Sequence, residues 1–377
     1  MVPFFKLTFR TELLIALLSL TFLISIFPYS NADDSSKYPL HSSREFRDPK
    51  RLTLCNEPVP IDDESVWEML DREFVISVGD KPQVVMWLKR AKRYFPYIEQ
   101  RLKEKGLPDD LKYLAVIESS LRRYSFSVKG AAGPWQFMEH TAKRYDLRVD
   151  RWFDDRLNFY RSTDAAIEYL RDLYEIFGSW ALSVAAYNCG EDRIKQEIKE
   201  QGVHDYYRLN LPLETERFVF RMLSAKIILS APGKYGFHLD EDEYYTPLEF
   251  DEVWVDAPSK IHLTVIARAA DSFFKEIKEL NPEIQGYHLP RGKHLVKIPK
   301  GTAELFTENF KKGIEELAKK EVEKIIYTYK VKKGDTLTSI AKRFNVTVAS
   351  IKKWNSLQTK RFIYPGQRLR IYTDTLK

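Results

Sequence analysis

The spacing of apolar side chains predicts helices through most of the chain between residues 65 and 248. Apolar residues recur there at intervals of three and four, which places them on one face of a helix. One example is the run Val84, Val85, Trp87, Leu88 and Ala91. Alternating strand patterns do not occur in this stretch, and glycine and proline clusters divide it into separate helices. We therefore expect residues 65–248 to form one mainly α-helical domain.

The pattern changes after Pro247, where short β-like runs flank single helical segments and the sequence repeats itself. Leu263–Ala267 recurs as Leu337–Ala341, and the match continues to Asn281 and Asn355 at a constant offset of 74 residues. Each copy ends in a proline and glycine turn followed by a short alternating strand. Self-similarity at a fixed offset indicates two copies of one small module.

The first 32 residues have the layout of a secretory signal peptide. Lys6 and Arg10 precede an apolar run from Leu13 to Phe27, and small residues stand at Ser30 and Ala32. An uncleaved membrane anchor is the alternative, but a run of 15 residues is short for a span of about 20. We expect cleavage after Ala32 and export to the periplasm or cell envelope.

These patterns together predict a multidomain protein. The expected division is a signal peptide at 1–32, an extended lead-in at 33–64, the helical domain at 65–248, a first module at 252–300, a helical linker at 301–326 and a second module at 327–373.

Composition and charge narrow the classes of function. With 44% hydrophobic and 30% charged residues the chain is globular. Its two cysteines and seven scattered histidines lack the spacing of metal ligands, so we expect no metal and no cofactor. From residue 323 to 377, 13 Lys and Arg residues face 3 acidic ones, which suits an anionic polymer. Because export argues against nucleic acid, the expected anionic target is cell-wall polymer.

One carboxylate stands on the apolar face of a predicted helix. Glu118 follows Leu111 by seven residues, two helical turns, and so points to the same side. Burying a carboxylate costs several kcal/mol unless it is paired or neutral. Glu118 is therefore either an ion-pair partner of Arg122, Arg123 or another arginine, or an acid whose raised pKa lets it donate a proton near neutral pH.

Two motifs later in the chain favour the second interpretation. The glycine-rich turn Gly130–Gly133 is followed by Gln136 and Met138, which suits a loop passing close to a ligand. Further on, Ala186-Tyr187-Asn188 ends a helix at Gly190 and offers a hydroxyl and an amide.

The three motifs, in this order and spacing, resemble the goose-lysozyme-like catalytic domain of soluble lytic transglycosylases. They are Glu118-Ser119, Gly133-Pro-Trp-Gln136-Phe-Met138 and Ala186-Tyr187-Asn188. With the C-terminal repeats, the chain resembles membrane-bound lytic murein transglycosylases of the D type from about Ser65 onward. The resemblance implies a lysozyme-like, mainly α domain followed by two small βααβ modules of the LysM type.

The resemblance also implies a reaction. Glu118 would protonate the glycosidic oxygen between N-acetylmuramic acid and N-acetylglucosamine. As the carboxylate it would then take the proton of the muramic C6 hydroxyl, so that a 1,6-anhydro ring closes without water.

Further roles follow from the resemblance. Ser119 would orient Glu118, Tyr187 would hydrogen-bond near the scissile bond, and Asn188 would pin its helix. Ser127, Gln136 and Met138 match positions that line the sugar subsites. The sequence departs from the family at Pro134, Cys189 and Phe218, and a disulfide between Cys189 and Cys55 is left open.

Hydrolytic glycosidases use two carboxylates that flank the bond. Residues 119–132 contain no Asp or Glu, which favours the one-acid mechanism. Four acids further along the chain could fold back into the cleft and supply a second carboxylate, but we expect them to be surface charges: Asp164, Glu168, Glu191 and Asp192. A hydrolytic muramidase is one alternative, and a catalytically silent peptidoglycan-binding scaffold is another.

The second module resembles LysM, which binds the N-acetylglucosamine backbone of peptidoglycan. The implied groove lies between a loop and the turn before the last strand, namely Gly334, Asp335, Thr336 and Leu337 facing Ile363 and Pro365. The first copy has Lys260-Ile261-His262 in place of this loop, so we interpret it as a degenerate module, more spacer than binder. The expected partner is the peptidoglycan glycan strand, bound by a monomer that associates at most peripherally with the membrane.

Overall fold

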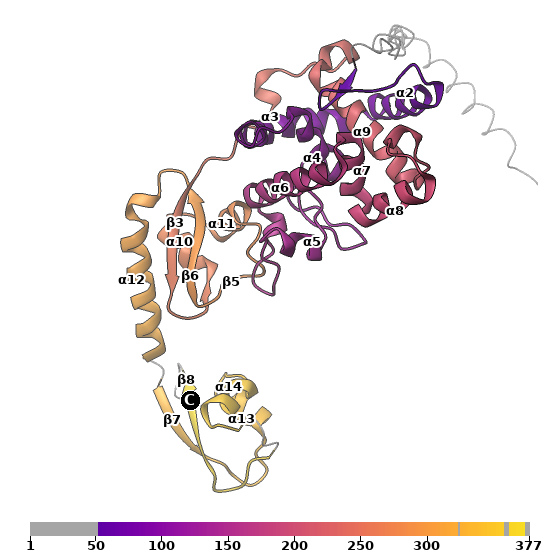
Figure 1. Cartoon of the computed structure of the whole chain (residues 1–377). Helices are drawn as coiled ribbons and strands as arrows, with labels where there is room; N and C mark the ends of the chain where they lie inside the picture. The colour runs from indigo at the N-terminus through magenta and orange to yellow at the C-terminus, as the bar shows by residue number, and fades with distance from the viewer. Residues whose placement is uncertain (1–51, 323–324, 358–361, 374–377) are drawn as a thin grey trace, which may run out of the picture.

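The computed structural model describes residues 52–322, 325–357 and 362–373 (Figure 1). The predicted signal peptide and residues 33–51 of the predicted lead-in lie outside the described residues. In the described part the apolar side chains form three separate cores. We refer to the corresponding parts as the helical unit (52–248), the second unit (250–322) and the third unit (325–373).

Helices dominate the helical unit, as the periodicity predicted. Their ends follow the local sequence: the Asp63 carboxylate accepts a hydrogen bond of 2.9 Å from the backbone N–H of Ser65 at the start of α2. Gly178, at φ 59°, ends α6 in the left-handed region. The elements are α2 (Glu64–Gly79), α3 (Lys81–Glu104), η3 (Asp109–Leu111), α4 (Lys112–Ser119), α5 (Glu139–Arg144), η4 (Asp155–Leu157), α6 (Phe159–Phe177), α7 (Trp180–Cys189), α8 (Glu191–Gln201), η5 (Tyr206–Arg208), α9 (Leu213–Ser230), η6 (Pro232–Tyr235) and η7 (Glu241–Glu243).

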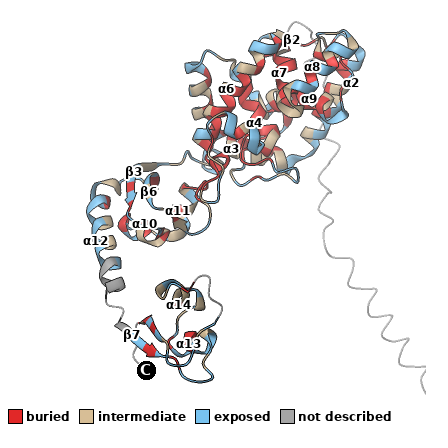
Figure 2. Ribbon diagram, turned by 60° about the horizontal axis from the view of Figure 1, so that its bottom comes forward, coloured by how far each residue is buried: buried red, intermediate tan, exposed pale blue. Residues whose placement is uncertain are grey.

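Two short helices, α4 and α7, form the centre of the helical unit. Both are buried on nearly every side, and both pack against α9 (Figure 2). A helix that is apolar all round belongs in a core. Any polar side chain at the end of such a helix therefore lies at the edge of the core. The candidate site is at the ends of these two helices.

The described part of the predicted extended lead-in is packed on the helical unit. Residues 52–63 contain the antiparallel pair β1 (Thr53–Leu54) and β2 (Glu57–Pro58). The reason is a set of apolar side chains between the prolines and polar residues, since Leu54, Val59 and Ile61 are each 1% exposed in the main core. This segment is part of the helical unit.

The second unit has a strand–helix–helix–strand order. Its long strands β3 (Phe250–Ala257) and β6 (Gly292–Pro299) pair antiparallel, with Trp254 opposite Leu295. Between them lie β4 (Ile261–His262), α10 (Leu263–Ala269), α11 (Phe274–Leu280) and β5 (His288–Leu289).

Helix α12 (Ala303–Val322) covers this second unit, whereas the sequence predicted a free helical linker. Phe306 is 1% exposed in the second core, and Phe310 and Ile314 pack against the same core. These residues recur every four positions and so share one face of the helix. The segment is helical as predicted, but it is packed on the second unit.

The third unit repeats the strand–helix–helix–strand order. It consists of β7 (Ile325–Lys330), α13 (Leu337–Arg343), α14 (Val348–Trp354) and β8 (Arg368–Thr373), with β7 and β8 antiparallel. Ile340 and Ile351 are fully buried, which confirms that the periodic apolar positions of the repeat are core residues.

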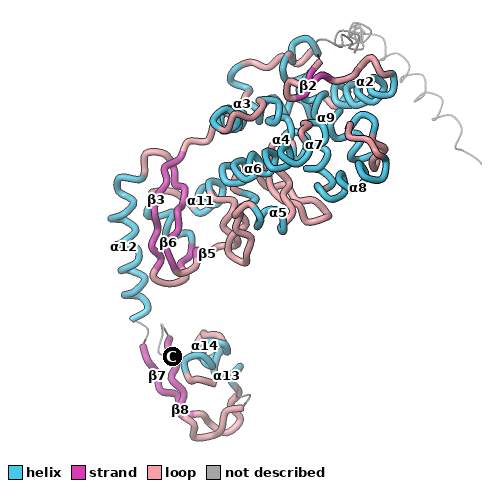
Figure 3. Tube along the Cα trace, in the orientation of Figure 1, coloured by secondary structure: helices cyan, strands magenta, loops and turns pink. Residues whose placement is uncertain are grey.

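The second unit is docked on the helical unit and is not a detached spacer. Phe153 pairs with Ile284 in an isolated bridge, and the Gln285 N–H donates 2.7 Å to the Trp152 carbonyl. The Asn158 side chain donates 2.7 Å to the Glu283 carboxylate. Loops next to α5 form this side of the helical unit (Figure 3). The predicted spacer role of the first repeat therefore does not describe its packing.

Among the described helices, none is both long and apolar enough to cross a bilayer.

Candidate active site

Helix α4 delivers Glu118 to the edge of the core. The helix has eight residues and ends abruptly because Ser120 and Leu121 both adopt left-handed φ values, 55° and 58°. Glu118 therefore stands in the last helical turn, where the carbonyl end of the helix disfavours a negative charge. It is half-buried between fully buried neighbours.

Glu118 lines a cavity of about 490 Å³ in the helical unit. The cavity brings together six of the seven residues that the sequence analysis assigned to the catalytic site. They are Glu118, Ser127, Gln136, Met138, Tyr187 and Asn188. The seventh, Ser119, does not line it.

The surroundings of Glu118 keep its carboxyl group neutral. Burial raises the pKa of Glu118 to about 8, and the nearby charge of Glu214 adds to the shift while Arg221 opposes it. Within the described residues, no ion pair or hydrogen bond engages the Glu118 side chain.

The ion-pair interpretation of Glu118 is therefore wrong. Arg122 donates to the Ser119 carbonyl at 3.0 Å and Arg123 to the Glu279 carbonyl at 2.5 Å, so both guanidinium groups are used elsewhere. Of the two alternatives left open by the sequence, the structure supports an acid that is protonated at neutral pH.

Ser119 does not orient Glu118. Its hydroxyl is buried and lies 2.7 Å from the Pro134 carbonyl oxygen and 3.3 Å from that of Ala115. Adjacent residues on a helix point about 100° apart, so Ser119 faces the core while Glu118 faces the cavity. Ser119 instead fastens the glycine-rich loop to α4.

The glycine-rich loop forms one wall of the cavity. The Gly133 N–H donates 2.8 Å to the Ser125 carbonyl, and Ala132 pairs with both Phe126 and Phe137 in isolated bridges. Gln136, at φ 48°, uses its side-chain amide on the Gly133 carbonyl at 2.8 Å. The predicted binding residue Gln136 thus also closes the turn that presents it.

The sequence analysis missed Arg156, which holds this loop from behind. Its guanidinium donates 2.9 Å to the Gly130 carbonyl and 3.1 Å to the Phe137 carbonyl, and it pairs with Asp154 at 2.8 Å. A buried arginine must satisfy its donors. Nothing in the local sequence links Arg156 to a turn some twenty residues earlier, so only the fold exposes its role.

Tyr187 and Asn188 lie in the last turn of α7 and line the same cavity. The Tyr187 hydroxyl donates 2.8 Å to the Trp135 carbonyl, and the Asn188 side chain accepts 2.9 Å from Thr215 on α9. Burial, reinforced by the charge of Glu118, raises the pKa of Tyr187 well above its usual value, so the phenol stays protonated. Cys189 lines the same cavity, and both it and Cys55 are free thiols.

Two further carboxylates, Glu191 and Glu214, also line the cavity. The sequence analysis expected Glu191 to be a surface charge, and this expectation is wrong. The turn at Gly190 aims the start of α8 back at the cavity. The sequence analysis did not identify Glu214, which stands four residues before the departure from the family at Phe218.

The remaining candidate acids lie outside the cavity. Asp164 pairs with Arg101 at 2.6 Å, and Glu168 pairs with Lys105 at 2.8 Å. The Asp192 side chain is 97% exposed. These three are surface charges, as expected.

In the third unit, two residues of the predicted glycan-binding loop serve the fold. The Asp335 carboxylate accepts 2.6 Å from the Tyr329 hydroxyl and 2.8 Å from the Lys332 N–H. Thr336 caps α13 by accepting 3.0 Å from the Ser339 N–H. Both side chains shape the loop and leave less capacity for direct ligand contact.

The other predicted groove residues of the third unit lie at its surface or on its core. Gly334 provides the left-handed turn at φ 91°. Leu337 and Ile363 are half-buried on the same core, and Pro365 is exposed. Two exposed aromatic residues flank this turn: Phe362 and Tyr364.

The comparison with known families agrees with this geometry. Residues 95–210, which include Glu118, the glycine-rich loop and Tyr187, match the family "Transglycosylase SLT domain". Residues 329–371 match the family "LysM domain". The chain contains a transglycosylase SLT domain and a LysM domain. The LysM match covers the second repeat, and the first repeat lies outside it.

The similarity of the chain to a curated relative extends beyond these two domains. The chain is 31% identical over 295 residues to "Membrane-bound lytic murein transglycosylase D" of Escherichia coli strain K12, which covers 75% of this chain and 64% of the relative. It is 33% identical over 117 residues to a "Putative tributyltin chloride resistance protein" of an Alteromonas species, or 30% of this chain and 56% of the relative. The chain thus spans less than two thirds of either relative.

A solved structure also resembles the SLT part of the chain. The 70 kDa soluble lytic transglycosylase of Escherichia coli is 20% identical over 41% of this chain and 27% of its own. The two structures superpose with a TM-score of 0.32.

Proposed function

We propose that this protein is a peptidoglycan lytic transglycosylase. It would cleave the β-1,4 bond between N-acetylmuramic acid and N-acetylglucosamine and leave 1,6-anhydro ends. The observation that carries the proposal is Glu118, whose pKa burial raises to about 8 in a cavity formed by the three motifs of the SLT domain. An unpaired acid that is protonated at neutral pH is suited to general acid catalysis.

In the proposed reaction the carboxyl group of Glu118 gives its proton to the glycosidic oxygen. The bond from that oxygen to the muramic C1 breaks and leaves an oxocarbenium-like sugar. The Glu118 carboxylate then removes the proton of the C6 hydroxyl, and O6 bonds to C1. Glu118 ends the cycle protonated, so the reaction neither consumes nor releases a proton. No cofactor is needed.

We assign the other cavity residues to substrate binding. Ser127, Gln136 and Met138 lie on the glycine-rich side, where their side chains would contact sugar rings and N-acetyl groups. Tyr187 and Asn188, in the last turn of α7, line the same cavity. Tyr187 would keep the loop at the right distance from Glu118, because its hydroxyl is bonded to the loop carbonyl of Trp135.

Hydrolysis by a muramidase is the rival, and Glu191 and Glu214 make it worth testing. A second carboxylate in the cavity is what water activation requires. Glu191, however, is held by Arg144 at 2.6 Å and by the Tyr169 hydroxyl at 3.1 Å. Although burial alone would raise its pKa, these hydrogen bonds lower the pKa of Glu191 and leave a weak base.

We further propose that the LysM domain anchors the enzyme to the wall from an exported location. Its loop, including Gly334 and Leu337, and the turn with Ile363 and Pro365 would receive the N-acetylglucosamine backbone. The first repeat at 252–300 would be a LysM-type module that has lost this loop. We propose a monomer whose contact with the membrane is peripheral.

Product analysis on purified sacculi tests the function. We expect wild-type protein to release fragments that are lighter than hydrolysis products by one water, and Glu118→Gln to release almost none. Glu191→Gln is the matched control in the same cavity and should keep more than about a tenth of the activity. Products with ordinary reducing ends would establish the muramidase instead. A Glu118→Gln variant of wild-type activity would exclude Glu118 as the acid, and wild-type protein that releases no fragments would exclude both enzymes.

A further inference from the structure

We infer that the cavity between the helical unit and the antiparallel pair β3–β6 is a second glycan-binding site. This cavity of about 340 Å³ is separate from that of Glu118 and lies on the sheet face turned away from α10 and α11. Its volume falls in the range of small-molecule sites, about 300–1,000 Å³. The choice of ligand, an N-acetylglucosamine-type saccharide of the same polymer, rests on the proposed function.

An exposed tryptophan forms one wall of this cavity. Trp254 on β3 is 61% exposed, and its cross-strand partner Leu295 on β6 is 44% exposed. The Lys293 ammonium lies 5.0 Å from the Trp254 ring centre and is held over it. An indole on the open face of a two-stranded sheet is costly to leave in water. It offers a flat apolar surface for the apolar face of a sugar ring.

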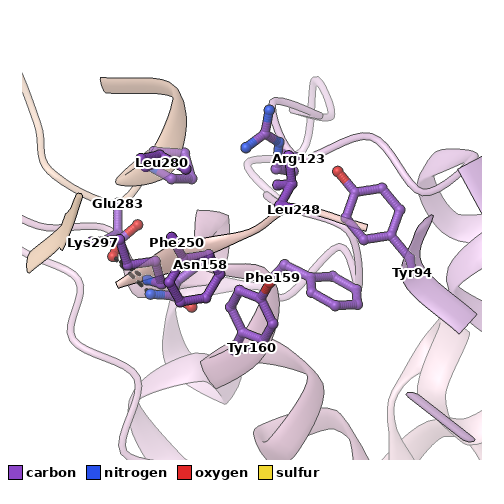
Figure 4. A pocket seen from close by; sticks show the side chains of 11 residues that line it. Tyr94, Arg123, Asn158, Phe159, Tyr160, Leu248, Phe250, Leu280, Glu283 and Lys297 are labelled. Carbon is purple, nitrogen blue, oxygen red and sulfur yellow. Dashed lines mark hydrogen bonds and ion pairs between the residues drawn. The ribbon is translucent and has the colours of Figure 1, made fainter. Parts of the chain in front are cut away.

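A buried carboxylate among the residues that line the cavity has an unused acceptor. Glu283 is 6% exposed, and its Oε1 accepts 2.7 Å from Asn158 and 3.2 Å from Lys297 (Figure 4). Its Oε2 has no hydrogen-bond partner among the described residues. Buried polar atoms are nearly always satisfied. A hydroxyl or N-acetyl N–H of a ligand would supply the missing donor.

An unused donor lies in the same cavity. The Arg148 Nε is buried without a partner, whereas its Nη2 contacts Asp155 at 3.4 Å and its guanidinium carbon lies 3.4 Å from the Phe153 ring centre. One orphan acceptor and one orphan donor, on two residues that line a single cavity, match a ligand with both kinds of group once these two side chains turn toward it. Sugar hydroxyls donate and accept at once.

The charges of the cavity favour a neutral ligand over an ionic one. An anion would meet the carboxylates of Asp155, Glu252 and Glu283, and a cation would meet Lys293, Lys297 and two arginines. Neither sign is in clear excess, so a saccharide fits better than a peptide carboxylate or a metal ion.

The position also suits a polymer that enters the active site. Arg161 lines both this cavity and a neighbouring one, which also contains Arg144. The Arg144 guanidinium reaches Glu191 in the Glu118 cavity at 2.6 Å. Arginine side chains thus connect the three cavities in pairs. A single glycan strand that contacted both this cavity and the Glu118 cavity would gain affinity from the second contact.

The test is fluorine NMR of the full chain labelled with 5-fluorotryptophan, titrated with N-acetylchitotriose. The Trp254 resonance is identified by its loss in Trp254→Phe. We expect this resonance to shift saturably. No shift at concentrations that saturate N-acetylchitotriose binding to the full chain, measured in parallel by calorimetry, would overturn the inference, as would a shift caused only by a free stem peptide.

Glu283→Gln makes the test specific to the orphan acceptor. Asn158 and Lys297 both donate to Oε1, so they hold the amide oxygen there and place the NH₂ at the Oε2 position. A donor then replaces the acceptor, and the Trp254 titration should need about tenfold more ligand. Phe273→Ala, an aromatic of the same unit that is also 61% exposed, is the control and should leave the curve unchanged.

Failure of this inference can be told from failure of the proposed function. Anhydro products without a Trp254 shift would remove the second site and leave the enzyme intact. A Trp254 shift without cleavage would leave the glycan site and remove the transglycosylase. An unchanged titration in Glu283→Gln, with the variant's melting temperature preserved, would also overturn the assignment of Glu283.

Discussion

The hydroxyl of Tyr187 donates a hydrogen bond of 2.8 Å to the carbonyl oxygen of Trp135. Trp135 is fully buried, and its indole N–H in turn donates 2.9 Å to Thr163 on α6. The glycine-rich loop is thus fixed from two sides, by the end of α7 and by α6. The distance across the Glu118 cavity depends on this pair of bonds.

We predict that Tyr187→Phe lowers both stability and catalysis. The Trp135 carbonyl loses its donor, which costs about 1–2 kcal/mol. The loop then shifts relative to Glu118, and small displacements of substrate-positioning groups lower kcat by about tenfold to a hundredfold. Thermal melts and steady-state kinetics on soluble glycan measure the two effects.

Tyr145→Phe is the control for that variant. It removes a hydroxyl that donates 2.9 Å to Asp172, outside the Glu118 cavity. Its stability should fall by a similar or smaller amount while kcat stays near wild type. Equal kcat in both variants would mean that the Tyr187 hydroxyl has no part in positioning the loop.

Gly133 and Gly130 provide a second matched pair. A Cβ at Gly133 would lie 1.8 Å from the backbone oxygen of Arg156, whereas a Cβ at Gly130 would meet nothing within 4 Å. Both have left-handed φ values, 84° and 90°. Gly133→Ala should therefore cost more than about 3 kcal/mol, and Gly130→Ala only about 1 kcal/mol of conformational strain. Denaturant unfolding of both variants checks the difference, and equal losses would contradict this account of Gly133.

Among the site residues, only Glu118 was predicted from local periodicity, whereas Gln136, Tyr187 and the others were predicted from the resemblance of their motifs to the family. Glu118 could be assigned to the inner face of a helix because the helical repeat relates it to Leu111. Arg156 and Glu214 could not be found in this way, because their contacts depend on how loops and helices far apart in the chain come together. Ser119 was given the wrong role for a related reason. It follows Glu118 in the sequence, but its hydroxyl contacts the Pro134 carbonyl across the core.

The fold shows the same division between local and long-range information. The helices and the repeated strand–helix–helix–strand order follow from spacing and from turn residues. The packing of Phe306 and of Ile61 does not follow from these patterns. A short apolar stripe shows that a segment is amphipathic, but it does not show which part of the protein covers it. A segment interpreted as lead-in and another interpreted as linker were therefore found within cores.

This packing determines where the chain can be shortened. A protein ending at Val322 lacks the LysM domain but keeps α12 on the second unit. We expect it to lose most affinity for intact sacculi and to cleave soluble glycan fragments as before. Sedimentation with sacculi and a soluble-fragment assay measure the two properties. Sacculus binding equal to that of the full chain would refute the anchoring role.

Comparison of the protein ending at Val322 with one ending at Gly301 measures how much α12 stabilises the second unit. The shorter protein also loses Phe306, which is 1% exposed in the second core, and the contacts of Phe310. Loss of a buried phenylalanine alone costs about 3–5 kcal/mol. The second unit should therefore melt earlier than in the protein ending at Val322. Identical melting would show that α12 contributes nothing to the second unit.

The raised pKa of Glu118 predicts how activity depends on pH. Burial is the main cause, Glu214 adds to it and Arg221 opposes it, so that the group titrates at about 8 in the free enzyme. The first step needs the protonated acid, so kcat/KM should fall about tenfold per pH unit above that pKa. A profile of kcat/KM from pH 5 to 10 on soluble glycan measures this. A flat profile up to pH 10 would exclude Glu118 as the general acid.

The same shift predicts how stability depends on pH. Below the usual Glu pKa of 4.5 both folded and unfolded chains carry the proton, and Glu118 imposes no penalty. As pH rises from there toward about 8, the unfolded chain releases the proton while the folded chain keeps it, so the free energy of unfolding falls. Glu118→Gln removes the ionisation and keeps the shape. It should therefore melt higher than wild type near neutral pH, by roughly a few degrees, with the difference vanishing near pH 4.

Paired thermal melts between pH 4 and 8 measure this difference, with Glu191→Gln as the control. Because hydrogen bonds lower the pKa of Glu191, its variant should be less stable than wild type at neutral pH. A Glu118→Gln variant that melts below wild type at neutral pH would mean that the carboxylate is stabilised in the folded state, and the general-acid assignment would lose its physical basis.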